Sequence, residues 1–281
     1  FAPSDLSLMF PLGSPILSPI PSADDILINI SADGTAGRLD IDELSLSLNR
    51  CVNLTASGYI ENMMQPKALG GNIRLRGNII NVNSFKNALL DKNTAKALRI
   101  PPMTLYGNIG MNRGSVAGNL KAATSDGDIR LDGRWNSNAE SYDAKLITRS
   151  FPVNAFMPLL GVGTVSARVD VNGTGYDPFR KSTAINANGE IKSAVYQGVD
   201  YTNIAVAANL HDGNAHVSLN SANPDADLTL TAEGNLNGDT YVWTANVDGR
   251  HIDLYALKFV PEPSSIELSA QADATIGPGR N

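Results

Sequence analysis

Along most of this chain, apolar side chains recur at every second residue. The stretches 44–48 (LSLSL), 73–79 (IRLRGNI) and 165–171 (VSARVDV) place aliphatic residues on one parity and polar residues on the other. Alternate residues of an extended strand point to opposite faces, so this pattern is typical of half-buried β-strands. Gly, Asn and Asp interrupt it at short intervals, as tight turns between antiparallel strands require. We therefore expect an all-β chain with on the order of fifteen strands.

Some segments depart from this alternation. Residues 1–25 are rich in proline, which donates no ladder hydrogen bond, and are predicted to be a lead-in segment. Residues 26–281 are expected to form a continuous β region, or two sub-units with a boundary near residue 100. Short amphipathic helices are predicted at 4–11, 83–90, 151–160 and 251–259, where apolar residues recur at three- and four-residue steps. Asp212-Gly213 predicts a hairpin turn.

Composition and motifs argue against several classes of function. The net charge is -6 and no window gathers Lys and Arg, so we expect no nucleic-acid partner. His211 and His216 flank a turn, and Asp126, Asp128 and Asp132 offer too few oxygen ligands for calcium. We predict no metal, no cofactor and no catalytic residue. The chain begins at Phe1 without a leader and is expected to be a fragment of a longer protein.

Glycines recur on the apolar parity of the strands. An interior glycine weakens a strand, so its recurrence indicates either curved sheets with glycine kinks or a groove shaped for an apolar ligand. The other inward residues are aliphatic, aromatic residues make up only 6% of the chain, and a buried acyl chain gains roughly 0.8 kcal/mol per CH₂. A groove would therefore suit acyl chains. The glycines are Gly77, Gly107, Gly118, Gly133, Gly173, Gly189, Gly234 and Gly249.

Residues 149–179, RSFPVNAFMPLLGVGTVSARVDVNGTGYDPF, resemble the recurrent unit of the TamB family of the AsmA-like superfamily, which belongs with the translocation and assembly module and the bridge-like lipid transfer proteins. The shared pattern is a strand, a short helix starting at FP, a small-residue turn, a strand and a G-x-G-x-DP turn. Residues 131–146 and 186–201 fit the same style, and the resemblance extends over 105–259.

The resemblance implies an elongated, strongly curved antiparallel sheet that forms an open hydrophobic groove, a β-taco, with a few short amphipathic helices. It also implies a non-enzymatic role in the periplasm, where the groove shields phospholipid or other acyl chains in transfer between the inner and outer membrane and supports outer-membrane biogenesis. An outer-membrane barrel-assembly-type protein is the implied partner. The implied inner-membrane anchor lies outside this chain.

The inward parity then gives the expected lining of the groove. The main alternative is a structural or adhesive β-sandwich or β-solenoid in which the same residues form a closed core. A carbohydrate-active protein is disfavoured, because the sequence lacks an aromatic stripe and paired acids. The lining residues are Ile73, Leu75, Leu131, Trp135, Val165, Val169, Val171, Ile185, Ile191, Val206 and Leu230.

Overall fold

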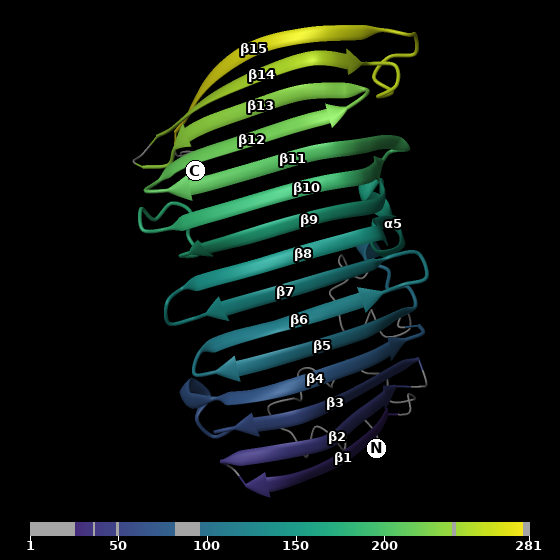
Figure 1. Ribbon diagram of the computed structural model, residues 1–281, viewed down its shortest axis with the longest axis vertical. Helices are drawn as coiled ribbons and strands as arrows, with labels where there is room; N and C mark the ends of the chain where they lie inside the picture. The colour runs from purple at the N-terminus through teal and green to yellow at the C-terminus, as the bar shows by residue number, and fades with distance from the viewer. Residues whose placement is uncertain (1–25, 36, 49–50, 82–95, 238–239, 278–281) are drawn as a thin grey trace. The chain divides into compact units, whose positions relative to one another are not determined.

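The computed structural model describes residues 26–35, 37–48, 51–81, 96–237 and 240–277. It is 71% strand, and its 15 strands form one antiparallel sheet in which each strand pairs with the next in the sequence (Figure 1). Among the described residues β1 and β15 have one neighbour each, so the sheet is not closed. The predicted all-β antiparallel fold is confirmed. The predicted lead-in (1–25) and the helices at 4–11 and 83–90 fall outside the described residues.

The chain divides into two compact units, and each is described by itself. The first comprises residues 1–132 and 150–162, and the second comprises 133–149 and 163–281. Strands wholly in the first unit are β1 (Ile26–Thr35), β2 (Arg38–Leu48), β3 (Val52–Glu61), β4 (Gly70–Ile79), β5 (Met103–Asn112) and β6 (Ser115–Ala123). The boundary between the two units falls within three strands, β7 (Asp128–Asn136), β8 (Ser141–Pro152) and β9 (Val162–Thr174). The second unit continues with β10 (Ala184–Tyr196), β11 (Val199–His211), β12 (Asn214–Asn223), β13 (Ala226–Asn235), β14 (Tyr241–Asp253) and β15 (Ser265–Ile276).

Cross-strand pairing in the first unit aligns the apolar residues in rows that run across β1 to β6. Each row joins aliphatic residues with a glycine. A slip of one residue would turn every one of these side chains to the opposite face, so the alternation itself fixes the register. One row is Ile28, Leu46, Leu54, Gly77, Leu105 and Ala122, and the next is Ile30, Leu44, Ala56, Leu75, Gly107 and Leu120.

The second unit builds the same kind of rows across β10 to β15. Its rows contain more alanine, and one of them is alanine at all positions but one. The row nearest the start of β10 is Ile185, Leu210, Ala215, Gly234, Trp243 and Ala274. The following rows are Ala187, Ala208, Val217, Ala232, Ala245 and Ala272; Gly189, Val206, Leu219, Leu230, Val247 and Ala270; and Ile191, Ile204, Ser221, Leu228, Gly249 and Leu268.

The helix and turn predictions have different outcomes. The helix predicted at 151–160 is confirmed as α5 (Val153–Phe156) and η3 (Pro158–Leu160), and a further 3-10 turn, η2, spans Pro66–Ala68. The helix predicted at 251–259 is wrong, because pairing with β13 and β15 keeps the chain in β14 as far as Asp253. Only one turn follows, in which the Leu257 N–H donates to the Asp253 carbonyl at 3.1 Å. The hairpin turn is confirmed, with φ of 50° at Asp212 and 72° at Gly213.

Candidate functional site

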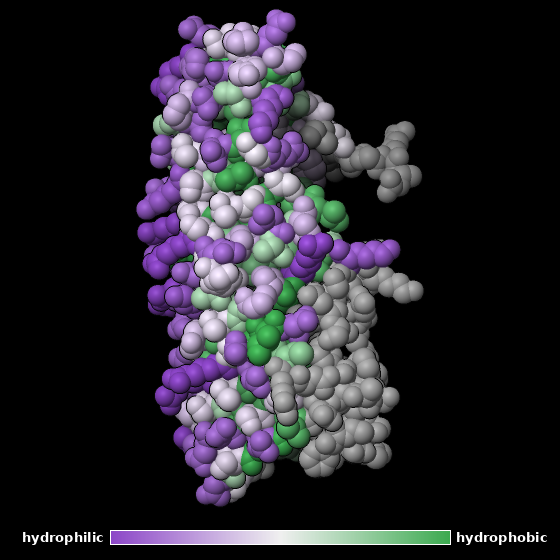
Figure 2. Space-filling model, turned by 90° about the vertical axis from the view of Figure 1, so that its right-hand side faces the viewer, coloured by the Kyte–Doolittle hydropathy of each residue, from purple (hydrophilic) through white to green (hydrophobic). Residues whose placement is uncertain are grey.

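The candidate site is the apolar face of the sheet, whose side chains are mostly only half-buried. In Figure 2 the hydrophilic residues line the left border of the view, and the hydrophobic residues lie to the right of them. A β-sandwich would bury such a face against a second sheet, but the described strands belong to one sheet. Among the described residues, the buried apolar side chains are Val52, Met103, Val199, Leu210, Ala226 and Leu257.

In the first unit, cross-strand pairing places Ile73 and Leu75 in the apolar rows. Ile73 and Leu75 are half-buried in β4, where Ile73 pairs with Ile109 and Leu75 pairs with Gly107 of β5. Leu131, on β7, is 42% exposed. These side chains therefore keep part of their apolar surface open to a ligand.

In the second unit four of the predicted residues, Ile185, Ile191, Val206 and Leu230, lie in the apolar rows. Val206 and Leu230 stand in one row, joined by Leu219 of β12. Trp135 lies near the end of β7, is 44% exposed, and donates its Nε1–H to the Tyr176 hydroxyl at 2.5 Å. It therefore belongs to the border of the face. The half-buried members of the predicted set are Val165, Val169, Val171, Ile185, Ile191, Val206 and Leu230.

Most glycines on the apolar parity make room for a neighbouring side chain. A Cβ added at Gly77 would lie 2.6 Å from Leu54 Cδ2, and one at Gly249 would lie 2.7 Å from Ile252 Cδ1. A Cβ at Gly234 would collide with the ring of Trp243, its direct partner across the β13–β14 pair. These glycines act as sockets in which large side chains can lie flat on the sheet.

At two glycines of this series an added Cβ would meet its neighbours only at ordinary contact distance. The nearest atom to a Cβ added at Gly133 is the Asp143 carbonyl oxygen at 3.7 Å, and at Gly189 it is the Val206 carbonyl oxygen at 3.9 Å. A neighbouring side chain therefore does not account for glycine at these two positions, whereas it does at most of the others.

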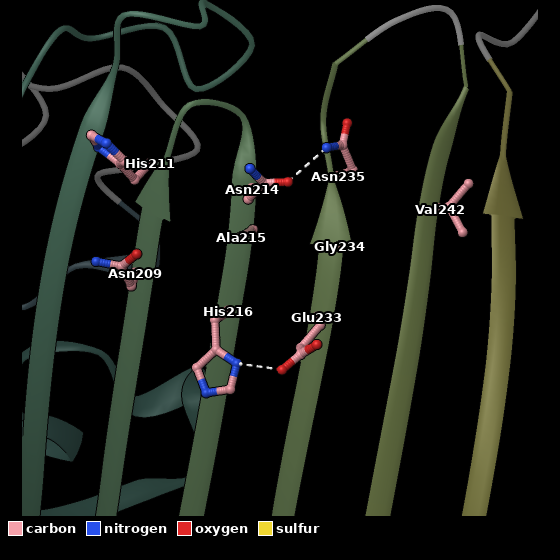
Figure 3. Close-up of a pocket in the computed structure, with 9 residues that line it drawn as sticks. All are labelled: Asn209, His211, Asn214, Ala215, His216, Glu233, Gly234, Asn235 and Val242. Carbon is pink, nitrogen blue, oxygen red and sulfur yellow. Dashed lines mark hydrogen bonds and ion pairs between the residues drawn. The ribbon is translucent and has the colours of Figure 1, made fainter.

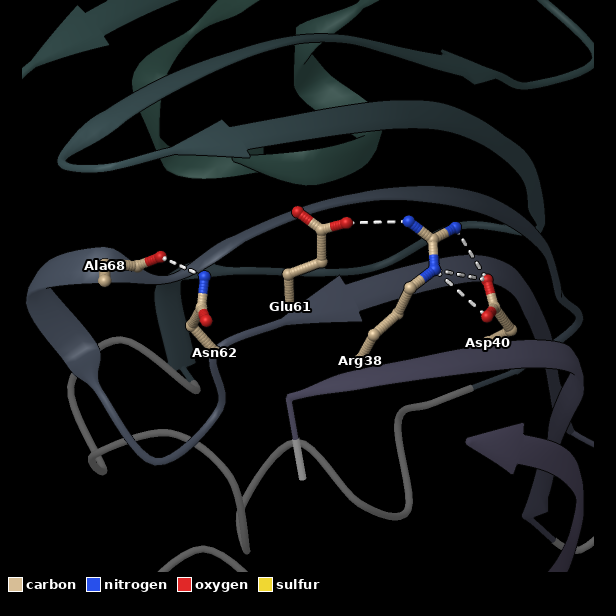
Figure 4. A network of polar contacts seen from close by, with 5 residues as sticks. All are labelled: Arg38, Asp40, Glu61, Asn62 and Ala68. Carbon is tan, nitrogen blue, oxygen red and sulfur yellow. Dashed lines mark hydrogen bonds and ion pairs between the residues drawn. The ribbon is translucent and has the colours of Figure 1, made fainter. Parts of the chain in front are cut away.

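The opposite face carries ion pairs that the sequence reasoning missed. Arg38 donates to Asp40 and, at 2.6 Å, to Glu61 (Figure 4). Its guanidinium also lies 4.2 Å from the centre of the Tyr59 ring. Hydrogen bonding to Arg38 lowers the pKa of the Asp40 carboxyl below its ordinary value. Two further pairs repeat this spacing, Arg130–Asp132 and Arg168–Asp170. The sequence pattern Arg-x-Asp could have predicted these ion pairs, because residues two apart in a strand share a face.

A cleft on the second unit is lined by His211 and His216 together with amide, carboxylate and apolar side chains (Figure 3). His216 lies 3.3 Å from Glu233, and the Asn235 side chain donates to Asn214 at 2.7 Å. His211 lies beside Asp212 at 3.4 Å. Within the described part of the chain, no group of three or more His, Cys, Asp or Glu side chains could hold a metal ion.

Together these features define a class of protein, an open antiparallel β-sheet with one aliphatic face and one charged face. A comparison with protein-family models, curated proteins and solved structures finds no match for the chain. No described helix is both long and apolar enough to cross a membrane.

Proposed function

We propose that this chain is a non-enzymatic, periplasmic segment of a TamB-like protein whose apolar face shields phospholipid acyl chains during transfer between the inner and outer membrane. The observation that carries the proposal is the set of continuous aliphatic rows, half-exposed along one face of a single open sheet. An acyl chain on these rows would remove both its own surface and theirs from water. The gain is roughly 0.8 kcal/mol per buried CH₂.

The chemistry of the rows favours acyl chains over other ligands. Aliphatic side chains offer no hydrogen bonds, so a ligand with polar groups along its length would lose its water without compensation. An acyl chain has no such groups and tolerates rows of uneven height. The charged face pairs many of its carboxylates with arginines, which suits a surface facing water.

The wider setting of the proposal comes from the resemblance described above. It includes a contribution to outer-membrane biogenesis, an outer-membrane barrel-assembly-type protein as partner, and an inner-membrane anchor outside this chain. The competing reading is a closed β-sandwich or solenoid with a structural or adhesive role. That reading requires the lining residues to be shielded from water, whereas Leu131 and Trp135 are 42% and 44% exposed.

The direct test is to ask whether lipid travels with the protein. Organic extracts of the purified protein should contain phospholipid by mass spectrometry, and photo-crosslinkers at Val169 or Ile185 should capture it in cells. A crosslinker at Asn188, exposed on the opposite face of β10, is the matched control. If no phospholipid copurifies and neither inward position captures any, the lipid-shielding function is wrong.

A pair of neighbouring substitutions separates an open face from a closed core. Leu230 and Thr231 are adjacent in β13 and point to opposite faces. Leu230→Asp should lower the amount of bound lipid with a modest loss of stability, and Thr231→Asp should leave bound lipid unchanged. A closed core predicts instead that Leu230→Asp unfolds the unit, since an unpaired buried carboxylate is strongly destabilising.

A further inference from the structure

Aromatic residues of the second unit are confined to strand ends and connections. Among its described residues, those at one end are Trp135, Tyr142, Tyr176, Phe179, Tyr241 and Trp243, here called the first border. Those at the other end are Tyr196, Tyr201, Tyr255 and Phe259, called the second border. Each residue is assigned to an end of the sheet from the strand order. In an antiparallel meander one strand ends where the next begins, so the ends of β7, β9 and β13 lie at the same end of the sheet as the starts of β8, β10 and β14 (Figure 1).

Between the two borders lies a purely non-aromatic band. The Ile185 row ends in Trp243 and Ala274 and so belongs to the first border, and along β10 the band runs from Ala187 to Ile191. A rise of about 3.4 Å per residue makes it about 14 Å wide. The hydrocarbon core of a bilayer is about 30 Å thick for two leaflets, so one acyl chain spans about 15 Å there. The width of the band thus matches the length of one acyl chain lying along the strands. Tyr and Trp concentrate where an apolar region meets a wet one, as at membrane interfaces.

Contacts at the first border hold its aromatic side chains in place. Tyr142 and Tyr176 stack with ring centres 6.2 Å apart, and Trp135 donates to the Tyr176 hydroxyl. Phe179 meets Tyr241 of β14 with ring centres 5.3 Å apart, although β10 to β13 intervene in the sheet order. The β9–β10 connection therefore reaches along this border.

The same connection presents cations at a defined place. Thr183 is buried and donates its hydroxyl to the Asp177 carbonyl at 2.6 Å, and the Asp177 carboxylate accepts the Phe179 N–H at 3.0 Å. Arg180 lies 3.7 Å from Asp177, while Lys181 is exposed and its ammonium has no ion-pair or hydrogen-bond partner among the described residues. The connection thus carries a free cation beside exposed aromatic rings.

At the second border, the described β14–β15 connection, residues 254–264, contains one cation, Lys258, and its ammonium is not free. Lys258 Nζ donates to the carbonyl oxygens of Gln197 at 3.2 Å and Gly198 at 2.9 Å. Leu257 packs with Val199 and Ala226 in the buried cluster of this unit. This border is therefore occupied by the chain's own contacts, and its ammonium is already bound.

We propose that the second unit orients a phosphodiester-bearing lipid across its strands, with the acyl chains on the aliphatic band and the phosphate at the first border near Lys181. This inference rests on the proposed function, in which lipid binds to the apolar face, and adds the orientation of that lipid. The indole and phenol groups of the border supply the hydrogen bonds that the glycerol region requires, and the aliphatic rows supply none.

The chain offers an intrinsic reporter, because both of its tryptophans, Trp135 and Trp243, belong to the first border. The protein is loaded with phosphatidylglycerol brominated either close to the glycerol or close to the terminal methyl group. Tryptophan fluorescence should be quenched more strongly by the bromine close to the glycerol. Equal quenching, or stronger quenching by the methyl-end bromine, would overturn the orientation.

A charge variant provides an independent readout with a matched control. Lys181→Gln should weaken phosphatidylglycerol binding about two- to fivefold, the range of an exposed ion pair. Lys192→Gln, on the charged face of β10, should have no effect. Equal effects of the two variants would contradict a phosphate site at Lys181. If mass spectrometry finds lipid bound but quenching does not depend on bromine position, only the orientation fails; if no lipid binds, the proposed function fails with it.

Discussion

The tyrosines of the two units lie in different places, although both units are meanders with aliphatic rows on one face. In the first unit, the strand tyrosines Tyr59 and Tyr106 sit within β3 and β5 on the charged face, where Tyr59 lies under Arg38. In the second unit the aromatic residues gather at the strand ends, around an aliphatic band. The same sheet can thus place its aromatic surface toward water-exposed charges or toward the rim of the apolar face.

The units also differ in what lies over their glycines. The flexible end of Leu54 lies above Gly77 in the first unit, whereas the rigid ring of Trp243 lies above Gly234 in the second. Leucine can change rotamer at little cost, but an indole ring that is part of a border cannot move without disturbing its neighbours. The second unit should therefore be the less tolerant of added bulk at these sites.

The largest expected effect tests this difference directly. Gly234→Val should destabilise the second unit by about 1–3 kcal/mol, the usual cost of overpacking, because Trp243 must leave its place on the sheet. Urea unfolding followed by tryptophan fluorescence measures both the stability and the displaced ring. Gly77→Val in the first unit is the comparison, and an equal or larger loss there would contradict the distinction between flexible and rigid neighbours.

A smaller effect is expected from the hydrogen bond at the first border. Tyr176→Phe keeps the stacking on Tyr142 but leaves the Trp135 indole N–H without its acceptor. The loss should be about 0.5–1.5 kcal/mol, the net value of one hydrogen bond, and water can replace part of it at this exposed site. Thermal unfolding measures it, and a red shift of Trp135 emission should accompany it. An unchanged emission spectrum would argue that the indole does not rely on Tyr176.

Substitution at Gly189 should raise the stability of the second unit slightly, in contrast to the two losses of stability above. Gly189→Ala adds a methyl group where the nearest atom is 3.9 Å away. Because alanine restricts the unfolded chain, the variant should be more stable by about 0.4–1 kcal/mol. Urea unfolding compares the free energy of unfolding of Gly189→Ala with that of Gly234→Ala. If both variants are destabilised, Gly189 does not have room for a methyl group in solution.

The smallest effect concerns the ion pairs of the charged face. Hydrogen bonding to Arg168 lowers the pKa of the Asp170 carboxyl. A lowered pKa contributes stability above the ordinary pKa of the group, and this contribution disappears as the pH falls through the lowered value. NMR titration should therefore show Asp170 titrating at lower pH than it does in Arg168→Gln. Identical titration midpoints would mean that the pair does not persist in solution.

The strands and their faces were predictable from sequence because alternation reports directly which residues share a face. Leu46, Leu75 and Val206 all lie on the face that parity assigned to them. The helix expected at 251–259 was wrong because the periodicity of those residues is overridden by strand pairing that the local pattern does not contain.

The borders were beyond sequence reasoning for a similar reason. Phe179 and Tyr241 are far apart in the chain, and nothing in either segment indicates that they meet. Trp135 was expected on the apolar parity, but its position near one end of the sheet depends on where β7 ends. Predicting which side chain lies over Gly77 or Gly234 requires the cross-strand partner, and parity alone does not give it.

The meander order has a consequence for how such a protein is made. Every strand pairs with its neighbours in the sequence, so the sheet needs no distant segment before it can begin to form. Contacts of low sequence separation favour fast folding, and nearest-neighbour architectures can start anywhere and propagate. The chain is therefore suited to assembling hairpin by hairpin as it is synthesised, and a hairpin could be added or lost without changing the pairing of the other strands.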